Sequence, residues 1–86
     1  MLPGQDLIEA GMADLERGRD SVPALLVSIA APRLRRLGLP IPRTIPSPER
    51  RLYEFLARDD PDAAHARYNA LIRRLVSFER AAECAR

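Results

Sequence analysis

The sequence has no lysine and no tryptophan, and cysteine occurs once, at Cys84. A single thiol excludes an internal disulfide and any cysteine-rich metal site that could reinforce the fold. Aromatic residues make up 5% of the 86 residues, and a chain this short buries only about 60–70% of its unfolded surface. The core must therefore be thin. We expect that it either suffices alone or is completed by the surface of a partner.

Long apolar segments are also missing. The first ten residues, MLPGQDLIEA, contain no basic region followed by an apolar run, so no secretory signal is predicted. The longest apolar stretch, residues 22–31, is about half as long as a membrane span requires. Together with the lone thiol, these absences predict a cytoplasmic protein.

Patterns typical of catalysis or metal binding are absent too. His65 is the only histidine, and with Asp62 on the same helical face it would supply two of the three or four ligands that a metal needs. A nuclease-like pairing of His65 with Arg58 or Arg67 lacks the surrounding polar groups. Cys84 has no nearby base, and no glycine-rich phosphate loop occurs. We expect no enzyme, no cofactor, no metal and no small-molecule substrate.

Arginine supplies all fourteen basic residues. Its guanidinium group makes planar, bidentate contacts with carboxylates and phosphates, although a GC-rich coding sequence would also favour arginine over lysine. The net charge of +2 conceals an uneven distribution. Five acids and two arginines give residues 1–20 a charge of −3, seven arginines and two acids give residues 21–58 a charge of +5, and residues 59–86 are balanced. Such a chain can pair its own segments or pair with a second copy.

Helical periodicity predicts an all-α fold, a single domain over residues 1–86 with about four helices. The first helix is expected over residues 4–17, where apolar residues recur at helical spacing and Gly18 provides a stop. The second begins at Asp20 or Ser21 and is apolar almost all round. Pro32 should break or sharply kink it, because a proline removes a backbone hydrogen bond, and a short last turn then ends at Gly38.

Residues 38–48, GLPIPRTIPSP, contain four prolines and no helical period. They predict an extended arm between the second and third helices, and prolines exclude it from the interior of a sheet. Ile41 and Ile45 alternate with polar or proline positions, so the arm should lie on an apolar surface. That surface is either the chain's own helices or a partner.

The third and fourth helices start with similar signals, Ser47-Pro48-Glu49 and Asp60-Pro61-Asp62. The third ends near Arg58, and its expected buried stripe is Leu52, Phe55 and Leu56. The fourth is the longest and has an apolar seam spaced alternately by four and three residues: Ala64, Tyr68, Leu71, Leu75, Phe78 and Ala82. Ile72 and Val76 form a second apolar line on it, which could face another chain.

The segments RRLYEF (residues 50–55) and RRLVSF (residues 73–78) share a layout, and a third RRL occurs at residues 35–37. In both six-residue segments the leucine and phenylalanine should lie on the buried face, with the arginines at its edge. Six positions are too few to establish a duplication. The resemblance is better explained by two helices whose apolar seams are framed by arginine stems.

These features favour a protein–protein interaction module that forms a homo-oligomer or serves as the small subunit of another protein. A regulatory partner, such as the antitoxin of a bacterial pair, is a concrete version suggested by small size, helicity and an arm that could wrap another protein. Aromatic residues and arginine dominate interface energetics. The residues expected at the interface are Tyr68, Leu71, Ile72, Arg73, Arg74, Leu75, Val76 and Phe78, with Ile41 and Ile45 of the arm.

An arginine-mediated nucleic-acid-binding regulator is the alternative. The third and fourth helices superficially allow a helix-turn-helix, but Asp59, Asp60 and Asp62 would place carboxylates at the end of the recognition helix that approaches phosphates. The aromatic residues mostly fall on expected buried stripes, where bases could not stack on them. The possible nucleic-acid contacts are Arg33, Arg35, Arg36, Arg43, Arg50 and Arg51.

Overall fold

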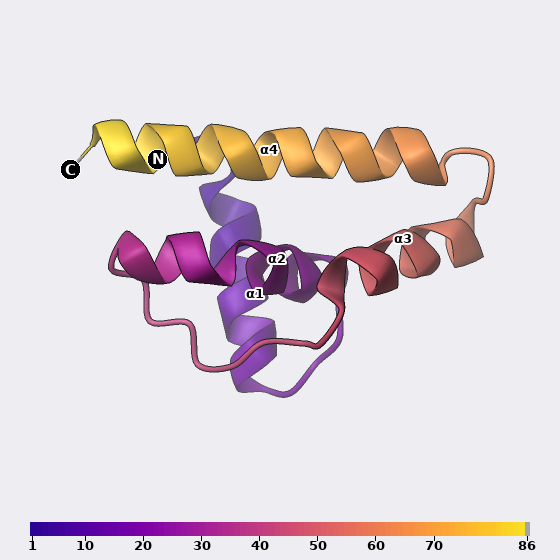
Figure 1. Cartoon of the computed structure of the whole chain (residues 1–86), viewed down its shortest axis with the longest axis horizontal. Helices are drawn as coiled ribbons and strands as arrows, with labels where there is room; N and C mark the ends of the chain where they lie inside the picture. Colours follow the sequence, from indigo (N-terminus) through magenta and orange to yellow (C-terminus); the bar gives the residue numbers. More distant parts are fainter. Residues whose placement is uncertain (86) are drawn as a thin grey trace.

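The computed structural model of the chain describes residues 1–85. It contains four α-helices: α1 (Gln5–Glu16), α2 (Val22–Arg36), α3 (Pro48–Asp59) and α4 (Ala64–Cys84). No strand occurs within this described part, which confirms the all-α prediction. Helix α4 runs along the long axis of the molecule above α2 and α3, and α1 crosses the other helices steeply (Figure 1). One cluster of buried side chains joins all four helices and the loop between α2 and α3.

Helices α1 and α2 approach each other most closely at Gly11. A Cβ atom added there would lie 2.5 Å from Cγ2 of Val27 and 2.7 Å from the carbonyl carbon of Pro23. Ile8 and Leu15 flank Gly11 on the same face and are 3% and 2% exposed. The glycine therefore sets the distance between the two helices, and its neighbours fill the space on either side.

Helix α2 is continuous from Val22 to Arg36, with Pro32 inside it. The predicted break is therefore wrong, whereas a kink, the alternative given with it, agrees with Figure 1, where the first and last turns of α2 run in different directions. Ala31 and Leu34 are fully buried on either side of the proline. Because the core holds both halves of the helix, the lost hydrogen bond bends α2 without ending it.

The predicted arm is a loop over residues 37–47, and it packs on the chain's own helices. Ile41 and Ile45 are buried, and the Ile45 N–H donates a hydrogen bond to Ser28 Oγ of α2 at 3.0 Å. Arg43 Nε donates to the Leu15 carbonyl at the end of α1 at 3.0 Å. The sequence left two candidate surfaces for the arm, the chain's own helices and a partner. In the structure the arm packs on the chain's own helices.

The start signals of α3 and α4 act differently from the prediction. Helix α3 begins at Pro48, but Ser47 has a positive φ of 49° and its side chain caps nothing. Asp60 and Pro61 belong to a turn in which Asp60 Oδ1 accepts hydrogen bonds from the backbone N–H groups of residues 62 and 63. Helix α4 therefore begins later, at Ala64.

The expected buried stripe of α3 is partly wrong. Leu52 and Leu56 are buried, but Phe55 is 42% exposed. In α4, by contrast, Leu75 and Phe78 are each 5% exposed. The shared sequence layout therefore does not produce the same burial, because α3 packs through Leu52 and Leu56 and turns Phe55 away from the core.

Candidate interaction surface

An apolar and aromatic strip crosses from α3 to α4. Tyr68, Ile72 and Val76 lie four residues apart on α4, so they form one line along the helix, and all three are half-buried. Tyr53 of α3 is 40% exposed, and its ring centroid is 6.0 Å from that of Tyr68, with the rings tilted by 57°. We call Tyr53, Tyr68, Ile72 and Val76 the α3–α4 strip.

The strip exists because α4 carries two apolar lines and the chain covers them only in part, leaving Tyr68 of the first line half-buried like Ile72 and Val76 of the second. Ala64, Leu75 and Phe78 face inward and are at most 5% exposed. The second line lies beside this buried face, where the other helices cover it only in part. The result is a row of large side chains that keep part of their apolar surface in contact with solvent.

One end of the strip is bordered by a charged cluster that joins α2 to α4. Glu79, three residues after Val76, is 6% exposed, and its Oε1 lies 3.7 Å from Arg33 Nη1. Arg33 Nε also donates to Glu83 Oε1 at 2.8 Å. Burial raises the pKa of Glu79 above its ordinary value, although Arg33 opposes the shift. The hydrogen bond to Glu83 raises the pKa of Arg33, against its partial desolvation.

The residues predicted at the interface fall into three groups. Tyr68, Ile72 and Val76 form the strip together with Tyr53, and Leu71 is half-buried beside them. Arg73 and Arg74 are exposed, and Arg74 Nη2 lies 3.3 Å from Asp6 Oδ1 of α1. The remaining predicted residues, each at most 8% exposed, belong to the chain's own core: Ile41, Ile45, Leu75 and Phe78.

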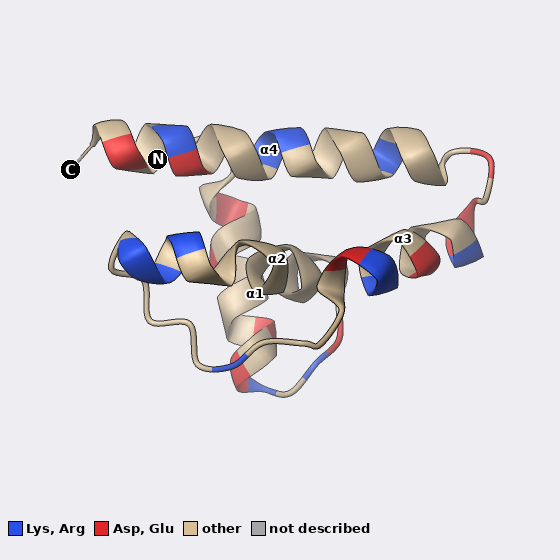
Figure 2. Ribbon diagram, in the orientation of Figure 1, with Lys and Arg blue, Asp and Glu red and all other residues tan. Residues whose placement is uncertain are grey.

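The arginines predicted to contact nucleic acid are used within the chain. Arg33 pairs with Glu79 and Glu83, as described above, and Arg51 pairs with Asp20. Arg50 Nε lies 3.5 Å from Glu54 Oε1, and Arg35 Nη2 donates to the Ile41 carbonyl at 3.3 Å. Figure 2 shows acids alternating with arginines along α3 and an acidic turn between α3 and α4. These contacts leave no continuous basic face on α3.

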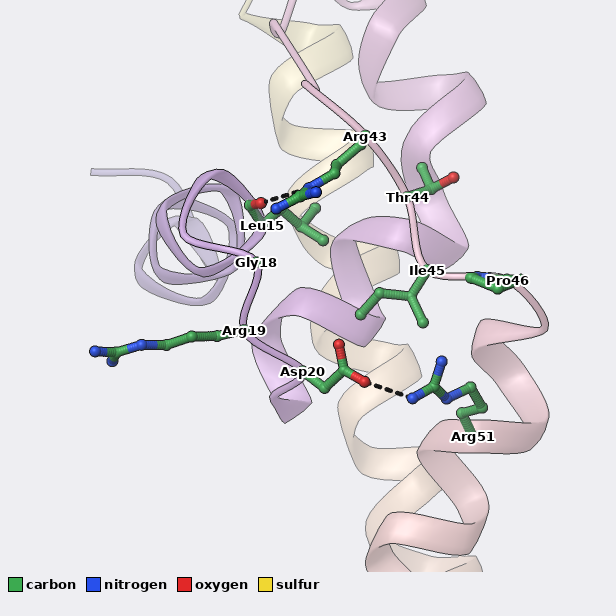
Figure 3. Close-up of a pocket in the computed structure, with 9 residues that line it drawn as sticks. All are labelled: Leu15, Gly18, Arg19, Asp20, Arg43, Thr44, Ile45, Pro46 and Arg51. Carbon is green, nitrogen blue, oxygen red and sulfur yellow. Dashed lines mark hydrogen bonds and ion pairs between the residues drawn. The ribbon is translucent and has the colours of Figure 1, made fainter.

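Arg43 lies in a hollow of about 250 Å³ between the end of α1, the loop and the start of α3. Its guanidinium group reaches across the hollow to the Leu15 carbonyl, the Asp20–Arg51 pair lies on the other side of Ile45, and Arg19 points away from them (Figure 3). The three charged groups inside the hollow are bound to one another or to backbone. These contacts hold the loop against α1 and join the segment between α1 and α2 to α3.

His65 and Cys84 form no site in the part of the chain that the structure describes. His65 is exposed, and its Nε2 lies 3.2 Å from Asn69 Nδ2. No group of three potential metal ligands occurs among residues 1–85, and Cys84 is an exposed free thiol. Within the same residues, every helix is too short or too polar to span a bilayer.

Phe55 is the surface aromatic that sequence reasoning placed wrongly, whereas Tyr53 was assigned to no buried stripe. Tyr53 lies outside the stripe formed by Leu52 and Leu56, so its place in the helical period already favoured exposure. Phe55 falls at a position that suits the stripe, three residues after Leu52, and nothing local in the sequence indicates that it is exposed.

Comparison of the chain with protein-family models, curated proteins and solved structures gives no match. The function must therefore be inferred from the surfaces of this chain alone.

Proposed function

We propose that the protein is a non-enzymatic protein–protein interaction module that docks on an apolar surface of its partner through the α3–α4 strip. The observation that carries the proposal is the contact between Tyr53 and Tyr68, which joins two helices and continues as the half-buried Ile72 and Val76. Tyrosine provides a large, rigid contact area with a polar tip, and it is enriched among residues that dominate binding energy.

The charged border supports the same function. The Arg33–Glu79–Glu83 cluster lies at one end of the strip, which matches the arrangement of protein interfaces, where an apolar centre is surrounded by a polar rim. Rim charges of this kind contribute little affinity but select the partner and its register.

The partner is either a second subunit, with a regulatory or antitoxin-like role as the concrete version, or a second copy of the chain. The lone exposed thiol of Cys84 suits a reducing compartment, so the cytoplasm is the proposed location. Small regulatory subunits of this kind act by occupying a surface of another protein, which requires no catalytic group.

The proposal is tested by the native mass and composition of tagged protein recovered gently from its own cells, for the parent chain and for Ile72→Glu. We expect the parent chain to be recovered in a stoichiometric complex, and the Ile72→Glu chain to be recovered folded but without the partner that docks on the strip. Ala70→Glu is the matched control, because it adds the same charge at an exposed position of the same helix. It should leave the complex intact.

A parent chain recovered as a monomer, or an Ile72→Glu complex identical to that of the parent, would contradict the proposal. Nucleic acid that co-purifies and is released steeply by salt would instead favour the arginine-mediated alternative. In that case the double substitution Arg35→Glu with Arg36→Glu should abolish its binding.

A further inference from the structure

An apolar hollow of about 290 Å³ opens at the end of the molecule opposite α3. Helix α1, the last turns of α4 and the start of the loop line it, and the side chains that matter here are Ile8, Glu9, Met12, Leu39, Phe78 and Ala82. Among the residues that line it, Glu9 is the only ionisable one. A cavity of about 150 Å³ is already sufficient for a benzene molecule, whereas sites for larger ligands start near 300 Å³. The hollow suits one phenyl ring with its flanking groups.

The described part of the chain also exposes a phenyl ring, that of Phe55. Phe55 is 42% exposed and stands between two surface depressions of α3. Arg50, Arg51 and Arg58 line the larger depression with it. Arg51 and Arg50 are held by Asp20 and Glu54, and no ion pair involving Arg58 is found among residues 1–85. Phe55 is thus an apolar projection with a cationic group one turn away.

The exposed Phe55 ring and the α1–α4 hollow complement each other but lie too far apart to meet within one chain. The molecule is 39 Å long, with α3 at one end of this axis and the last turns of α4 at the other (Figure 1). One side combines an aromatic ring with an arginine, and the other combines an apolar hollow with a glutamate. Phe55 can therefore reach such a hollow only in a second molecule.

We infer that the chain associates with a second copy of itself, Phe55 of one copy seating in the α1–α4 hollow of the other while Arg58 pairs with Glu9. An antiparallel, two-fold arrangement would use this contact twice, since each copy carries both halves. The inference concerns a surface separate from the α3–α4 strip. Either can fail without the other, because Ile72→Glu leaves the Phe55 contact unchanged.

Sedimentation of the purified full chain from about 10 µM to 1 mM tests the contact, in the range expected for an interface with one aromatic anchor. We expect Phe55→Ala to weaken self-association by about 30-fold or more, the effect typical of an interface hot spot. Glu49→Ala is the control, since Glu49 is exposed on the same helix and belongs to neither the strip nor the lining of the hollow. It should leave the mass unchanged. A parent chain that is monomeric at 1 mM, or a Phe55→Ala chain that associates like the parent, would overturn the inference.

Mixing two variants tests whether the Phe55 side of one chain binds the hollow of the other. Ala82→Trp should fill the hollow and keep Phe55, whereas Phe55→Ala keeps the hollow empty. Neither variant should associate alone, but an equimolar mixture should form a one-to-one pair through the remaining contact. Because Ala82→Trp could disturb α4, Glu9→Arg and Arg58→Glu, both at exposed positions, provide a second pair. Each should weaken association alone, and their mixture should restore it. A mixture in which no association returns for either pair would overturn the inference.

Methyl NMR tests whether Phe55 of one copy enters the hollow of the other. The Met12 and Ala82 methyl resonances should shift upfield as the concentration of the parent chain rises, because an aromatic ring from the second copy enters the hollow. Phe55→Ala should abolish that shift. Concentration-independent methyl resonances in a chain that does associate would place the contact elsewhere and would also refute the inference.

Discussion

Replacing Gly11 by alanine is the sharpest test of how α1 packs on α2. In an open helix, glycine to alanine stabilises by about 1 kcal/mol, because alanine restricts the unfolded backbone and favours the helix. At Gly11 the new Cβ would lie 2.5 Å from Val27 Cγ2 and still closer to the Pro23 carbonyl oxygen. A backbone oxygen cannot rotate away, so the two helices must separate until the contact approaches the usual spacing of carbon atoms, about 3.5 Å or more.

The clash should outweigh the gain in helix propensity. Overpacking a tight core costs about 1–3 kcal/mol, and separating the helices also loosens Ile8 and Leu15, the buried neighbours of Gly11. A clash at the upper end of this range, about 3 kcal/mol, less a gain of about 1 kcal/mol, gives an expected net loss of about 2 kcal/mol. The total free energy of unfolding is about 4–13 kcal/mol for a chain of this size. The corresponding fall in Tm is about 8–16 °C.

Urea unfolding followed by circular dichroism measures this loss. Ala10→Gly is the matched control, because Ala10 is the exposed neighbour of Gly11 on the same helix and reports the propensity difference alone, about 1 kcal/mol. If Gly11→Ala stabilised the chain by the amount that Ala10→Gly destabilises it, the close approach of α1 and α2 would be refuted.

Three further experiments test the loop, the charged border and the strip. Ser28→Ala leaves the buried Ile45 N–H without its acceptor and should lower the free energy of unfolding in urea by about 1–3 kcal/mol. The control Ser77→Ala, at an exposed position of α4, should change this free energy by less than about 0.5 kcal/mol. Burial raises the pKa of Glu79, so the folded chain keeps this proton to a higher pH than the unfolded chain does. The stability of the parent relative to Glu79→Gln should therefore fall as the pH rises above 4.5 and then level off, and unfolding curves at several pH values measure this difference. A parallel or opposite profile would contradict the shift. A double-mutant cycle of Tyr53→Ala and Tyr68→Ala should give a coupling energy of about 0.5–1.5 kcal/mol, and a coupling near zero would mean that the rings do not interact.

The helices and the loop could be predicted because each has a local signal in the sequence. The stripes of α1 and α4 repeat at the helical period, and the prolines of residues 38–48 exclude regular structure there. The outcome at Pro32 could not be predicted in the same way. Whether a proline breaks or bends a helix depends on how firmly the core holds both sides, and the burial of Ala31 and Leu34 is set by contacts between distant segments.

The candidate surface was only partly predictable for the same reason. The second apolar line of α4 indicated Ile72 and Val76 as candidates, and both are half-buried. It did not indicate that Tyr53 would extend the line from α3, because the position of one helix against another is absent from helical periodicity. For Ile41 and Ile45 the sequence left two surfaces open. Alternation predicted that they touch an apolar surface, but only the fold shows that the chain itself supplies it.

Phe55 and Phe78 show how far a shared sequence layout determines energetics. Both follow the pattern of two arginines, a leucine and a phenylalanine three residues later, yet one is 42% exposed and the other 5%. Phe78→Ala should cost about 3–5 kcal/mol, because it removes a buried ring and leaves a cavity. Phe55→Ala removes a ring that is already partly exposed, so we expect a smaller change, about 1 kcal/mol or less, in the unfolding free energy of the dilute chain. Urea unfolding of both variants under the same conditions makes the comparison. Equal losses would mean that Phe55 is buried like Phe78. A small loss at Phe55 would show that the ring contributes little to folding, so that Phe55→Ala can be used to test a contact with another molecule without unfolding the chain.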